Sequence, residues 1–499
     1  MKFFFNDLLF IDENKTNIIF LLGTKVIPKA LNNCSEVINN ILSTIDCTIF
    51  QYNKIVPSLV KINGFYQRLL FCRIKSLRQI DKINIQRIGA HLADELNKMQ
   101  VSEANIFFSD IKNNQEEVSF IVNLCEGIKL KNYVFNRYLS CKKESIISLK
   151  KITVYSSSSA NAKELFNSKE KIIDGTHFVR DLVSEPANVL TPDYFTSLCE
   201  ELKKIGVDVE VLDTKKLQQL GMNAILAVGQ GSRFGTYLVC MRWNGTIKSQ
   251  NHKNEPITFI GKGITFDTGG INLKTSSVSL ATMKYDMGGA AVVTGLIQSL
   301  ARRKAKVDVM GIIGIAENML SNSAQRPGDI ITSMSGKTIE VNNTDAEGRL
   351  LLADVIYYAQ KFFQPKVIID LATLTGGVIS ALGYSNAGIF SNSDSLVNKL
   401  VQAGKEVGET VWRLPLDKCY DKLIDSDIAD IKNTGGGYAA SSITAAQFLQ
   451  RFIFNDCIWA HIDIAGVNWL SNGGDFSPKG ASGYGVRLLN KFLINNYEN

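Results

Sequence analysis

The sequence predicts an α/β protein with a smaller N-terminal α/β domain and a larger three-layer α/β/α domain around a central, mostly parallel sheet. Two observations support this prediction. From about residue 170, short apolar runs alternate with glycine-rich loops and amphipathic stretches of helical length, as in parallel strands joined by crossover helices. The chain also has 499 residues, 45% apolar and 21% charged, which suffices for more than one ordinary core.

The larger domain can be followed element by element. Residues 257–261 predict a short strand that leads into a glycine-rich loop at 262–270. Residues 288–303 have the length and periodicity of a helix, and its basic end suits the helix dipole. A buried strand at 307–315, a helix at 349–363 and a strand at 367–371 follow. In such a domain the loops at the strand ends carry the functional groups.

The first 150 residues are rich in Ile, Lys and Asn. Strand-like runs at 18–22 and 118–122 alternate there with a helix-like stretch at 88–99. A basic cluster, interpreted as solvated surface, precedes a serine run at 156–159, and this combination is typical of an exposed connection. We therefore predict an N-terminal α/β domain at 1–155, a linker at 156–174 and a second domain at 175–499. The basic residues are Lys142, Lys143, Lys150 and Lys151.

Composition excludes several classes of protein. The formal charge is 55 − 48 = +7, too small by itself to indicate nucleic-acid binding. Nine cysteines without a CxxC pair predict free thiols in a reducing compartment. No run approaches the roughly 18 apolar residues of a membrane span, and Asn6 and Asp7 interrupt the apolar N-terminus, so no signal peptide is expected. The sequence predicts a cytoplasmic protein without a membrane partner.

Four loop carboxylates predict a divalent-metal site. Asp267, Asp286, Asp345 and Glu347 lie in polar, glycine-flanked segments. Four carboxylates in one cleft would raise one another's pKa unless cations neutralise them. A pair of divalent ions bridged by carboxylates is the simplest arrangement. With only four histidines in the chain, any metal site must depend on carboxylates.

Each motif also has a structural alternative. Thr344 and Glu347 fit a helix capping box, and taken alone this interpretation is favoured. The loop at 262–270 does not fit the phosphate-binding pattern GxxxxGK[ST]. The stretch 229–235 imitates a dinucleotide-binding turn, but its third glycine is wrongly spaced, so nucleotide binding is disfavoured. His461 lies in an apolar strand, which favours a core position, or one behind the site, over a metal ligand.

The octapeptide NTDAEGRL at 343–350 resembles the signature of the leucyl aminopeptidase family of dinuclear metallo-exopeptidases. Similar stretches follow the family's order at 181–192, 261–270, 283–291, 372–376, 426–430, 459–466 and 480–487. The resemblance thus covers nearly all of 175–490, and it implies that 175–499 is a catalytic dimetal peptidase domain. The first 150 residues carry no matching motif, and only membership implies the family's small α/β domain there.

The resemblance implies a ligand set for two metal ions. Lys262, Asp267, Asp286 and Glu347 would bind one ion, while Asp267, Asp345 and Glu347 would bind the other. A lysine binds a metal only as the neutral amine, so the cations must lower its pKa far below about 10.4. Carboxylate-rich ligands favour hard ions, with Mn²⁺ first and Zn²⁺ or Mg²⁺ as alternatives. One extra residue in the segment 276–280 leaves its local geometry open.

Lys274 and Arg349 resemble the family's catalytic pair. Lys274 would stabilise the oxyanion of the tetrahedral intermediate. Arg349 would hold a bicarbonate ion through two hydrogen bonds, and that ion would carry the proton. The free α-amino group of the substrate would bind one metal, which explains a preference for N-terminal residues.

The resemblance also implies a substrate pocket, formed by Met283, Thr373, Leu374, Gly376 and Ala465, with Asn468 near its floor. Asn468 departs from the family, and a buried amide needs a partner or a water. We therefore expect a weaker preference for leucine than the family name suggests. The implied protein is a cytosolic homohexamer that hydrolyses N-terminal leucine and other apolar residues from peptides. The alternative, an additional DNA-binding role, is supported only by the basic charge.

Overall fold

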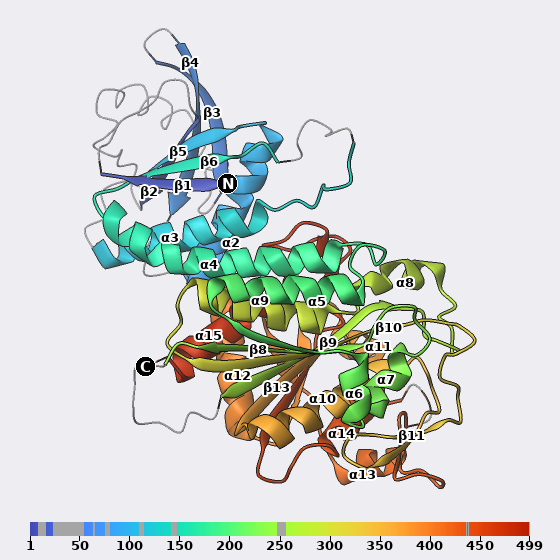
Figure 1. Cartoon of the computed structure of the whole chain (residues 1–499). Coiled ribbons are helices and arrows are strands. Elements are labelled where there is room, and N and C mark those ends of the chain that lie inside the picture. The colour runs from blue at the N-terminus through green and yellow to red at the C-terminus, as the bar shows by residue number, and fades with distance from the viewer. Residues whose placement is uncertain are drawn as a thin grey trace. The chain divides into compact units, whose positions relative to one another are not determined.

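Figure 1 shows the computed structural model of the chain, which describes residues 1–7, 16–22, 54–62, 65–74, 80–108, 114–140, 147–246, 256–435, 437 and 439–498. The chain forms two compact units. The first comprises Met1–Ile173 with Gly473–Pro478, and the second Asp174–Asn472 with Lys479–Asn499. None of the helices in the described ranges combines the length and apolar character needed to span a membrane.

The first unit contains a six-stranded sheet in the order β1-β6-β5-β2-β4-β3. Only the β3–β4 pair is antiparallel among its described strand pairs. Helices α2 and α3 pack against each other and contribute much of its apolar core. The elements are β1 (Lys2–Asn6), β2 (Thr16–Leu22), β3 (Ile55–Ile62), β4 (Phe65–Ile74), α2 (Lys82–Lys98), β5 (Glu103–Phe108), α3 (Asn114–Lys131) and β6 (Lys151–Tyr155).

Two predictions for the first unit are wrong. The expected strand at 118–122 lies within α3, because its apolar residues continue at helical spacing through Leu124, Cys125 and Ile128, all buried. The serine run at 156–159 is mostly buried, and only Ser157 in it is exposed. Ser156 and Ser158 are buried and donate hydrogen bonds of 2.7 and 2.9 Å to the buried carboxylate of Glu117.

The segment that follows the serine run is also helical. Helix α4 (Ser159–Ser184) occupies most of the predicted linker at 156–174. The predicted strand at 18–22 and helix at 88–99 are confirmed as β2 and α2. Of the predicted basic cluster, Lys150 is exposed and Lys151 pairs with Glu103 at 3.3 Å. Lys142 and Lys143 lie outside the described residues.

The second unit is built on an eight-stranded sheet in the order β15-β14-β17-β13-β9-β10-β8-β7. Its four central strands, β17, β13, β9 and β10, are parallel to one another, and antiparallel pairs occur only towards the edges. The strands are β7 (Asp208–Leu212), β8 (Tyr237–Asn244), β9 (Ile257–Asp267), β10 (Asp308–Asn318), β13 (Val367–Ala372), β14 (Ala387–Ser391), β15 (Val411–Arg413) and β17 (Ile458–Asp463).

Helices cover both faces of this sheet (Figure 1). On β10, a Cβ at Gly311 would meet Val293 and Ile297 of α9, whereas a Cβ at Gly314 would meet Leu351 and Val355 of α10. Positions 311 and 314 face opposite sides of a strand, so α9 and α10 form opposite outer layers. The predicted three-layer architecture with a central, mostly parallel sheet is confirmed.

The remaining elements complete the second unit. Its helices are α5 (Pro192–Glu200), η2 (Glu201–Ile205), α6 (Thr214–Gln219), α7 (Asn223–Gly229), α8 (Ser277–Thr282), η3 (Met283–Tyr285), α9 (Gly288–Arg302), α10 (Glu347–Phe363), α11 (Gly376–Leu382), α12 (Asp394–Val407), α13 (Lys418–Asp421), η4 (Lys422–Ile424), α14 (Ser441–Gln450) and α15 (Val486–Asn496). Its short strands are β11 (Ile330–Thr332), β12 (Thr338–Glu340), β16 (Ile431–Lys432), β18 (Trp469–Leu470) and β19 (Gly480–Ala481).

One expected loop is partly strand. Strand β9 does not end at residue 261 but pairs with β10 from Ile257 to Asp267. The first residues of the predicted loop at 262–270 are therefore strand residues, because parallel pairing satisfies their backbone groups. Lys262 and Asp267 are consequently held by the sheet itself. The expected helices at 288–303 and 349–363 are confirmed as α9 and α10.

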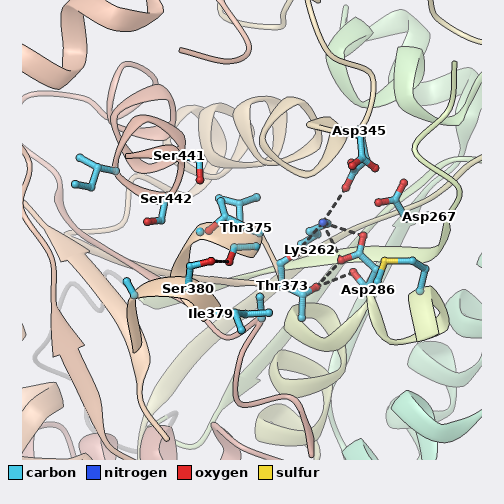
Figure 2. Close-up of a pocket in the computed structure, with 18 of the residues that line it drawn as sticks. Lys262, Asp267, Asp286, Asp345, Thr373, Thr375, Ile379, Ser380, Ser441 and Ser442 are labelled. Carbon is cyan, nitrogen blue, oxygen red and sulfur yellow. Dashed lines mark hydrogen bonds and ion pairs between the residues drawn. The ribbon is translucent and has the colours of Figure 1, made fainter. Parts of the chain in front are cut away.

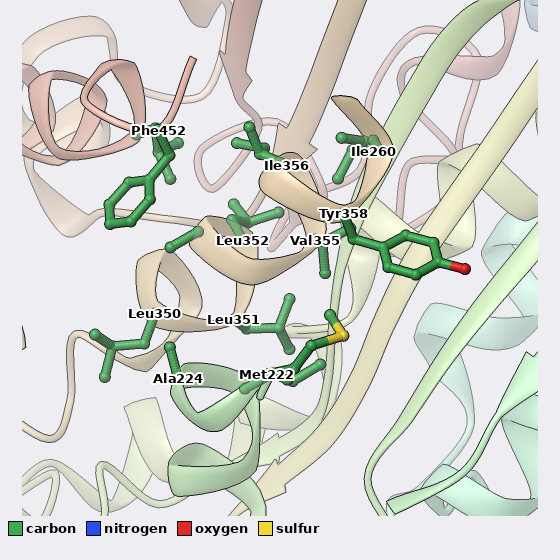
Figure 3. Close-up of a cluster of buried hydrophobic side chains, with 14 of the residues drawn as sticks. Met222, Ala224, Ile260, Leu350, Leu351, Leu352, Val355, Ile356, Tyr358 and Phe452 are labelled. Carbon is green, nitrogen blue, oxygen red and sulfur yellow. The ribbon is translucent and has the colours of Figure 1, made fainter. Parts of the chain in front are cut away.

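A buried carboxylate links α10 to α7 within the larger core. Figure 3 shows apolar side chains of α10, among them Leu351 and Val355, close to Met222 and Ala224. Asp354 of α10 accepts hydrogen bonds from the backbone N–H groups of Ala224 and Ile225, at 2.8 and 3.0 Å. Since α7 has no side-chain cap of its own, Asp354 satisfies the first turn of α7 from a neighbouring helix.

The Asp354→Asn variant should therefore be less stable by about 1–3 kcal/mol, because an amide nitrogen would face backbone donors and leave them unpaired. Urea unfolding of the variant and the parent protein would measure this difference. Asp427→Asn, at an exposed position, is the matched control and should change stability very little. Equal effects of the two substitutions would contradict the role given to Asp354.

Candidate functional site

A cavity of about 850 Å³ in the second unit contains most of the predicted site residues. Its charged end lies where β9 reaches its carboxyl end and where α9 and α10 begin, the usual place for functional groups in a parallel sheet. Lys262 and Asp267 come from β9, Asp286 directly follows η3, and Glu347 is the first residue of α10. The charged lining residues are Lys262, Asp267, Lys274, Asp286, Asp345 and Glu347.

Two lysines bind the four carboxylates in pairs, and Figure 2 shows Lys262 beside Asp286. The Nζ atom of Lys262 lies 2.9 Å from the Asp286 carboxylate and 2.8 Å from Glu347, and it donates to the Thr373 carbonyl at 2.9 Å. The Nζ atom of Lys274 lies 2.8 Å from Asp267 and 2.5 Å from Asp345. The structure thus brings all five predicted metal ligands and Lys274 into one cluster.

The charges of this cluster shift the pKa values of its members. Burial alone would lower the pKa of Lys262 and of Lys274, but the surrounding carboxylates outweigh it and raise both. Burial, together with the Asp267 and Glu347 carboxylates, raises the pKa of Asp345 to about 7. Burial also raises the pKa of Asp286. The predicted neutral amine of Lys262 applies to a metal-loaded site and stays a prediction.

The cluster fits divalent cations on its own chemistry. Four carboxylates and two ammonium groups leave a formal charge of −2 in a buried place. Carboxylate oxygens of Asp267, Asp345 and Glu347 lie within 4.8 Å of one another. Glu347 Oε2 is buried without a hydrogen-bond donor among the described residues. Such an oxygen requires a cation or a donor, so these residues can hold metal ions.

The capping-box alternative for Thr344 and Glu347 is wrong. Helix α10 begins after Ala346, and no side chain caps it. The Thr344 hydroxyl instead donates to the Gly269 carbonyl at 2.6 Å. Glu347 is therefore available to the cluster. A Cβ at Gly348 would lie 2.6 Å from Lys262 Cε, so glycine there leaves room for the Lys262 side chain to reach Glu347.

Arg349 is buried near the cluster but does not line the cavity. Its Nη1 donates to the Asn433 carbonyl at 2.8 Å, and its Nε has no acceptor among the described residues. Burial lowers the pKa of Arg349 to about 10, although Glu347 and Asp463 oppose that shift. The guanidinium therefore lies behind the ligands rather than at the cavity surface.

An apolar wall continues from the charged end of the cavity. Met283, Leu374, Gly376 and Ala465 line it together with Thr373, as predicted for the substrate pocket. Asn468 does not line it. This side chain is fully buried, and its Nδ2 donates to the Tyr285 carbonyl at 3.2 Å. The expected weak preference for leucine, which depended on Asn468, therefore loses its basis.

Several residues of the site were not predicted from the sequence. Asp463 lies at the end of β17, and its carboxylate accepts hydrogen bonds from the Leu374 backbone N–H at 3.0 Å and the Thr375 hydroxyl at 2.7 Å. The sequence feature that could have identified Asp463 is its position as an acidic residue at the end of an apolar strand. Ser441 and Ser442, the first residues of α14, line the part of the cavity away from the charged end (Figure 2). Their only signal was a serine pair after a glycine run.

His461 lies below the site, in the core. It is fully buried on β17, and its Nδ1 is 2.5 Å from Asp370 Oδ1. Asp370 also accepts a hydrogen bond of 2.7 Å from Trp459 Nε1. This pair connects β13 to β17 beneath the loop that Asp463 holds. His461 does not line the cavity, in agreement with its interpretation as a core residue.

Comparisons with known proteins agree with this site. Residues 177–490 match the catalytic domain of the cytosol aminopeptidase family, and residues 58–142 match that family's N-terminal domain. A probable cytosol aminopeptidase of Ehrlichia ruminantium (strain Welgevonden) is 48% identical over 423 residues, 84% of this chain and 82% of the relative. One of Phytoplasma australiense is 48% identical over 402 residues, 80% of each chain.

A solved structure shows the same fold. The bottromycin maturation enzyme BotP in complex with Mn superposes with a TM-score of 0.81 and 25% sequence identity, covering 96% of this chain and 99% of that one. The family match spans more than half of the sequence and includes every charged residue of the cavity. The chain therefore belongs to the cytosol aminopeptidase family, a family of metal-dependent exopeptidases that hydrolyse peptides.

Proposed function

We propose that this protein is a leucyl aminopeptidase that uses two divalent metal ions to remove N-terminal leucine and other apolar residues from peptides. One observation supports this most directly. Four carboxylates and two lysines gather at one end of a cavity whose adjoining wall is apolar. A metal centre beside an apolar pocket suits a peptide whose first side chain is apolar.

Lys262, Asp267, Asp286, Asp345 and Glu347 would hold the two ions, with Asp267 and Glu347 shared between them. Bound there, divalent ions would polarise the scissile carbonyl and activate a water molecule. Mn²⁺ is the first candidate and Zn²⁺ or Mg²⁺ the alternatives, because carboxylates prefer hard ions. The presence of Mn in the BotP complex supports Mn²⁺ as the first candidate.

The residues around the metal ligands would position the substrate. Lys274 is partly exposed at the cavity surface, so its ammonium can donate to the oxyanion that develops on the scissile carbonyl. Asp463 and Thr375 fix the backbone of 374–376, along which the peptide would lie. A bicarbonate ion at Arg349 remains a prediction, and the position of Arg349 outside the cavity lining gives it no support.

Location and assembly complete the proposal. The resemblance of the motifs to the leucyl aminopeptidase family supports a homohexamer. The free-thiol cysteine pattern supports a cytoplasmic location. Peptides would be the partners of the catalytic site. A DNA-binding role finds no supporting observation beyond the charge of +7.

Removal of divalent ions with a chelator should abolish the release of leucine from a leucine anilide, and added Mn²⁺ should restore most of the activity. The physical reason is that the buried cluster keeps an uncompensated negative charge without cations. Parallel additions of Zn²⁺ and Mg²⁺ would rank the metals. Full activity in protein shown to be metal-free by elemental analysis would contradict the mechanism.

The Glu347→Gln variant should lose bound metal and at least about 100-fold in kcat, because a neutral amide is a poor bridging ligand. Metal stoichiometry, melting temperature and turnover should be measured together. Glu117→Gln removes an equally buried carboxylate in the first unit and should keep both metals. A Glu347→Gln protein with two metals and near-normal turnover would show that Glu347 is not a bridging ligand.

The Ala465→Leu variant tests the pocket for the first side chain. Filling the apolar wall at this position should lower kcat/KM for leucine substrates about 10-fold or more relative to alanine substrates, since a methylene or two in such a pocket is worth about 1–3 kcal/mol. The ratio of kcat/KM for leucine and alanine anilides measures the effect. An unchanged ratio would place the leucine side chain elsewhere in the cavity.

A further inference from the structure

The N-terminus of α14 lines the cavity at the end away from the charged cluster. Ala440, Ser441 and Ser442 form that end, whereas every charged residue in the described lining belongs to the cluster. In Figure 2 both serines lie on one side of Thr375, and Lys262 lies on the other. The two ends of the cavity therefore present different chemistry to a ligand, and the end at α14 contains no carboxylate that would repel an anion.

The first turn of α14 has unpaired backbone donors. The N-cap residue is Ala440, whose side chain has no acceptor for the helix. Its carbonyl accepts hydrogen bonds of 2.9 Å from the backbone N–H groups of Ile443 and Thr444. The N–H groups of Ser441 and Ser442 have no acceptor among the described residues. Such donors, together with the helix dipole, favour a negatively charged group at a helix N-terminus.

The side chain of Ser442 is a second, independent donor at the same place. Ser442 is 6% exposed and lines the cavity, and its hydroxyl has no hydrogen-bond partner among the described residues. The hydroxyl is not one of the unpartnered polar atoms that are fully enclosed, so a ligand in the cavity can reach it. Since burying a hydroxyl without a partner is costly, its partner must come from the cavity.

The segment proposed to hold the peptide leads to these donors. A Cβ at Gly377 would lie 2.2 Å from Ser441 Oγ and 3.3 Å from the Ser442 backbone nitrogen. The absence of a side chain at Gly377 therefore leaves the N-terminus of α14 open to the cavity. A peptide that starts at the metal site and follows the backbone of 374–376 would reach α14 next. The negative group that every unmodified peptide carries at its far end is the C-terminal carboxylate.

We propose that the N-terminus of α14, with Ser441 and Ser442, binds the C-terminal carboxylate of a short peptide substrate. Two backbone N–H groups and two serine hydroxyls would donate hydrogen bonds to its oxygens. The inference rests on the proposed peptidase function, and it identifies short peptides with a free C-terminus as the substrate class. A side-chain carboxylate offers the same chemistry from another source, and the experiment separates the two.

The test compares kcat/KM of the metal-loaded, full-length protein for leucyl-alanine and leucyl-alanyl-alanine, each as the free acid and as the amide. For at least one length, the parent protein should prefer the acid about 10-fold, as expected for charge-assisted hydrogen bonds. Leucyl-aspartic acid amide, which has its carboxylate only in the side chain, should be no better a substrate than leucyl-alanine amide.

Two variants assign the preference to α14. Ser442→Ala should reduce it about threefold or more, because one donor to a charged group is lost. Ser441→Asp should abolish it, since an aspartate suits the first turn of a helix but repels a carboxylate. Ser395→Ala is the matched control, at an exposed serine in the first turn of α12, and should leave the preference unchanged.

The proposal is overturned if the parent protein does not prefer the acid at either length, or if either variant keeps the parental preference. It is also overturned if the side-chain carboxylate is preferred as strongly as the C-terminal one. If Ser442→Ala fails to fold, as judged by circular dichroism, Ser441→Asp decides alone.

Failure of the proposed peptidase function would give a different result, namely that none of the leucyl peptides is hydrolysed. The carboxylate site is then tested by calorimetric titration with the same peptides. Tighter binding of the acid than of the amide, lost in Ser441→Asp, supports the site. Equal or undetectable binding of the two overturns it.

Discussion

The second unit depends on a balance of charge at the carboxyl end of β9. Four carboxylates and two lysines share a largely buried space, where ion pairs are stronger than in water and each unpaired charge is costly. The lysines alone do not neutralise the carboxylates: burial and mutual repulsion raise the pKa of Asp267 and Asp286, against the opposing effect of the lysines. Such a cluster persists only if the fold forces its members together, or if divalent cations bind it.

The fold holds the cluster together through its most regular elements. Lys262 and Asp267 lie on a strand with parallel neighbours on both sides, so their positions are fixed by backbone hydrogen bonds. Glu347 begins a helix whose opposite part is packed in the larger apolar core and linked to α7 by Asp354. Three members of the cluster are thus carried by the sheet and by a buried helix. Asp286 and Asp345 lie in the turns directly before α9 and α10. Support of this kind suits a preorganised metal site.

A second set of carboxylates lies behind the apolar wall of the cavity and supports it. Asp463 holds the loop at 374–376, and Asp370 holds His461 between β13 and β17. These side chains do not line the cavity. They can therefore influence its shape only through the backbone segments that they position.

The sequence by itself determined the three-layer fold, several strands and helices between residues 257 and 371, and the carboxylates of the cluster. Its lysines were identified through the resemblance of the motifs to the leucyl aminopeptidase family. These features depend on local periodicity and on short motifs whose residues are close in the chain. The predictions from sequence were wrong where one local pattern is compatible with two different structures. The run at 118–122 fits a strand or part of a longer helix, and the serines at 156–159 fit a loop or donors to a buried Glu117.

Only the tertiary structure decided the remaining questions. It placed Asn468 against Tyr285 rather than in the pocket, Arg349 behind the charged cluster, and Asp463 beside the backbone of 374–376. It also showed that Thr344 bonds to Gly269 instead of capping α10. Each of these contacts joins residues far apart in the chain. The direction of a side chain then depends on which segments pack beside it, and local sequence carries no information on that choice.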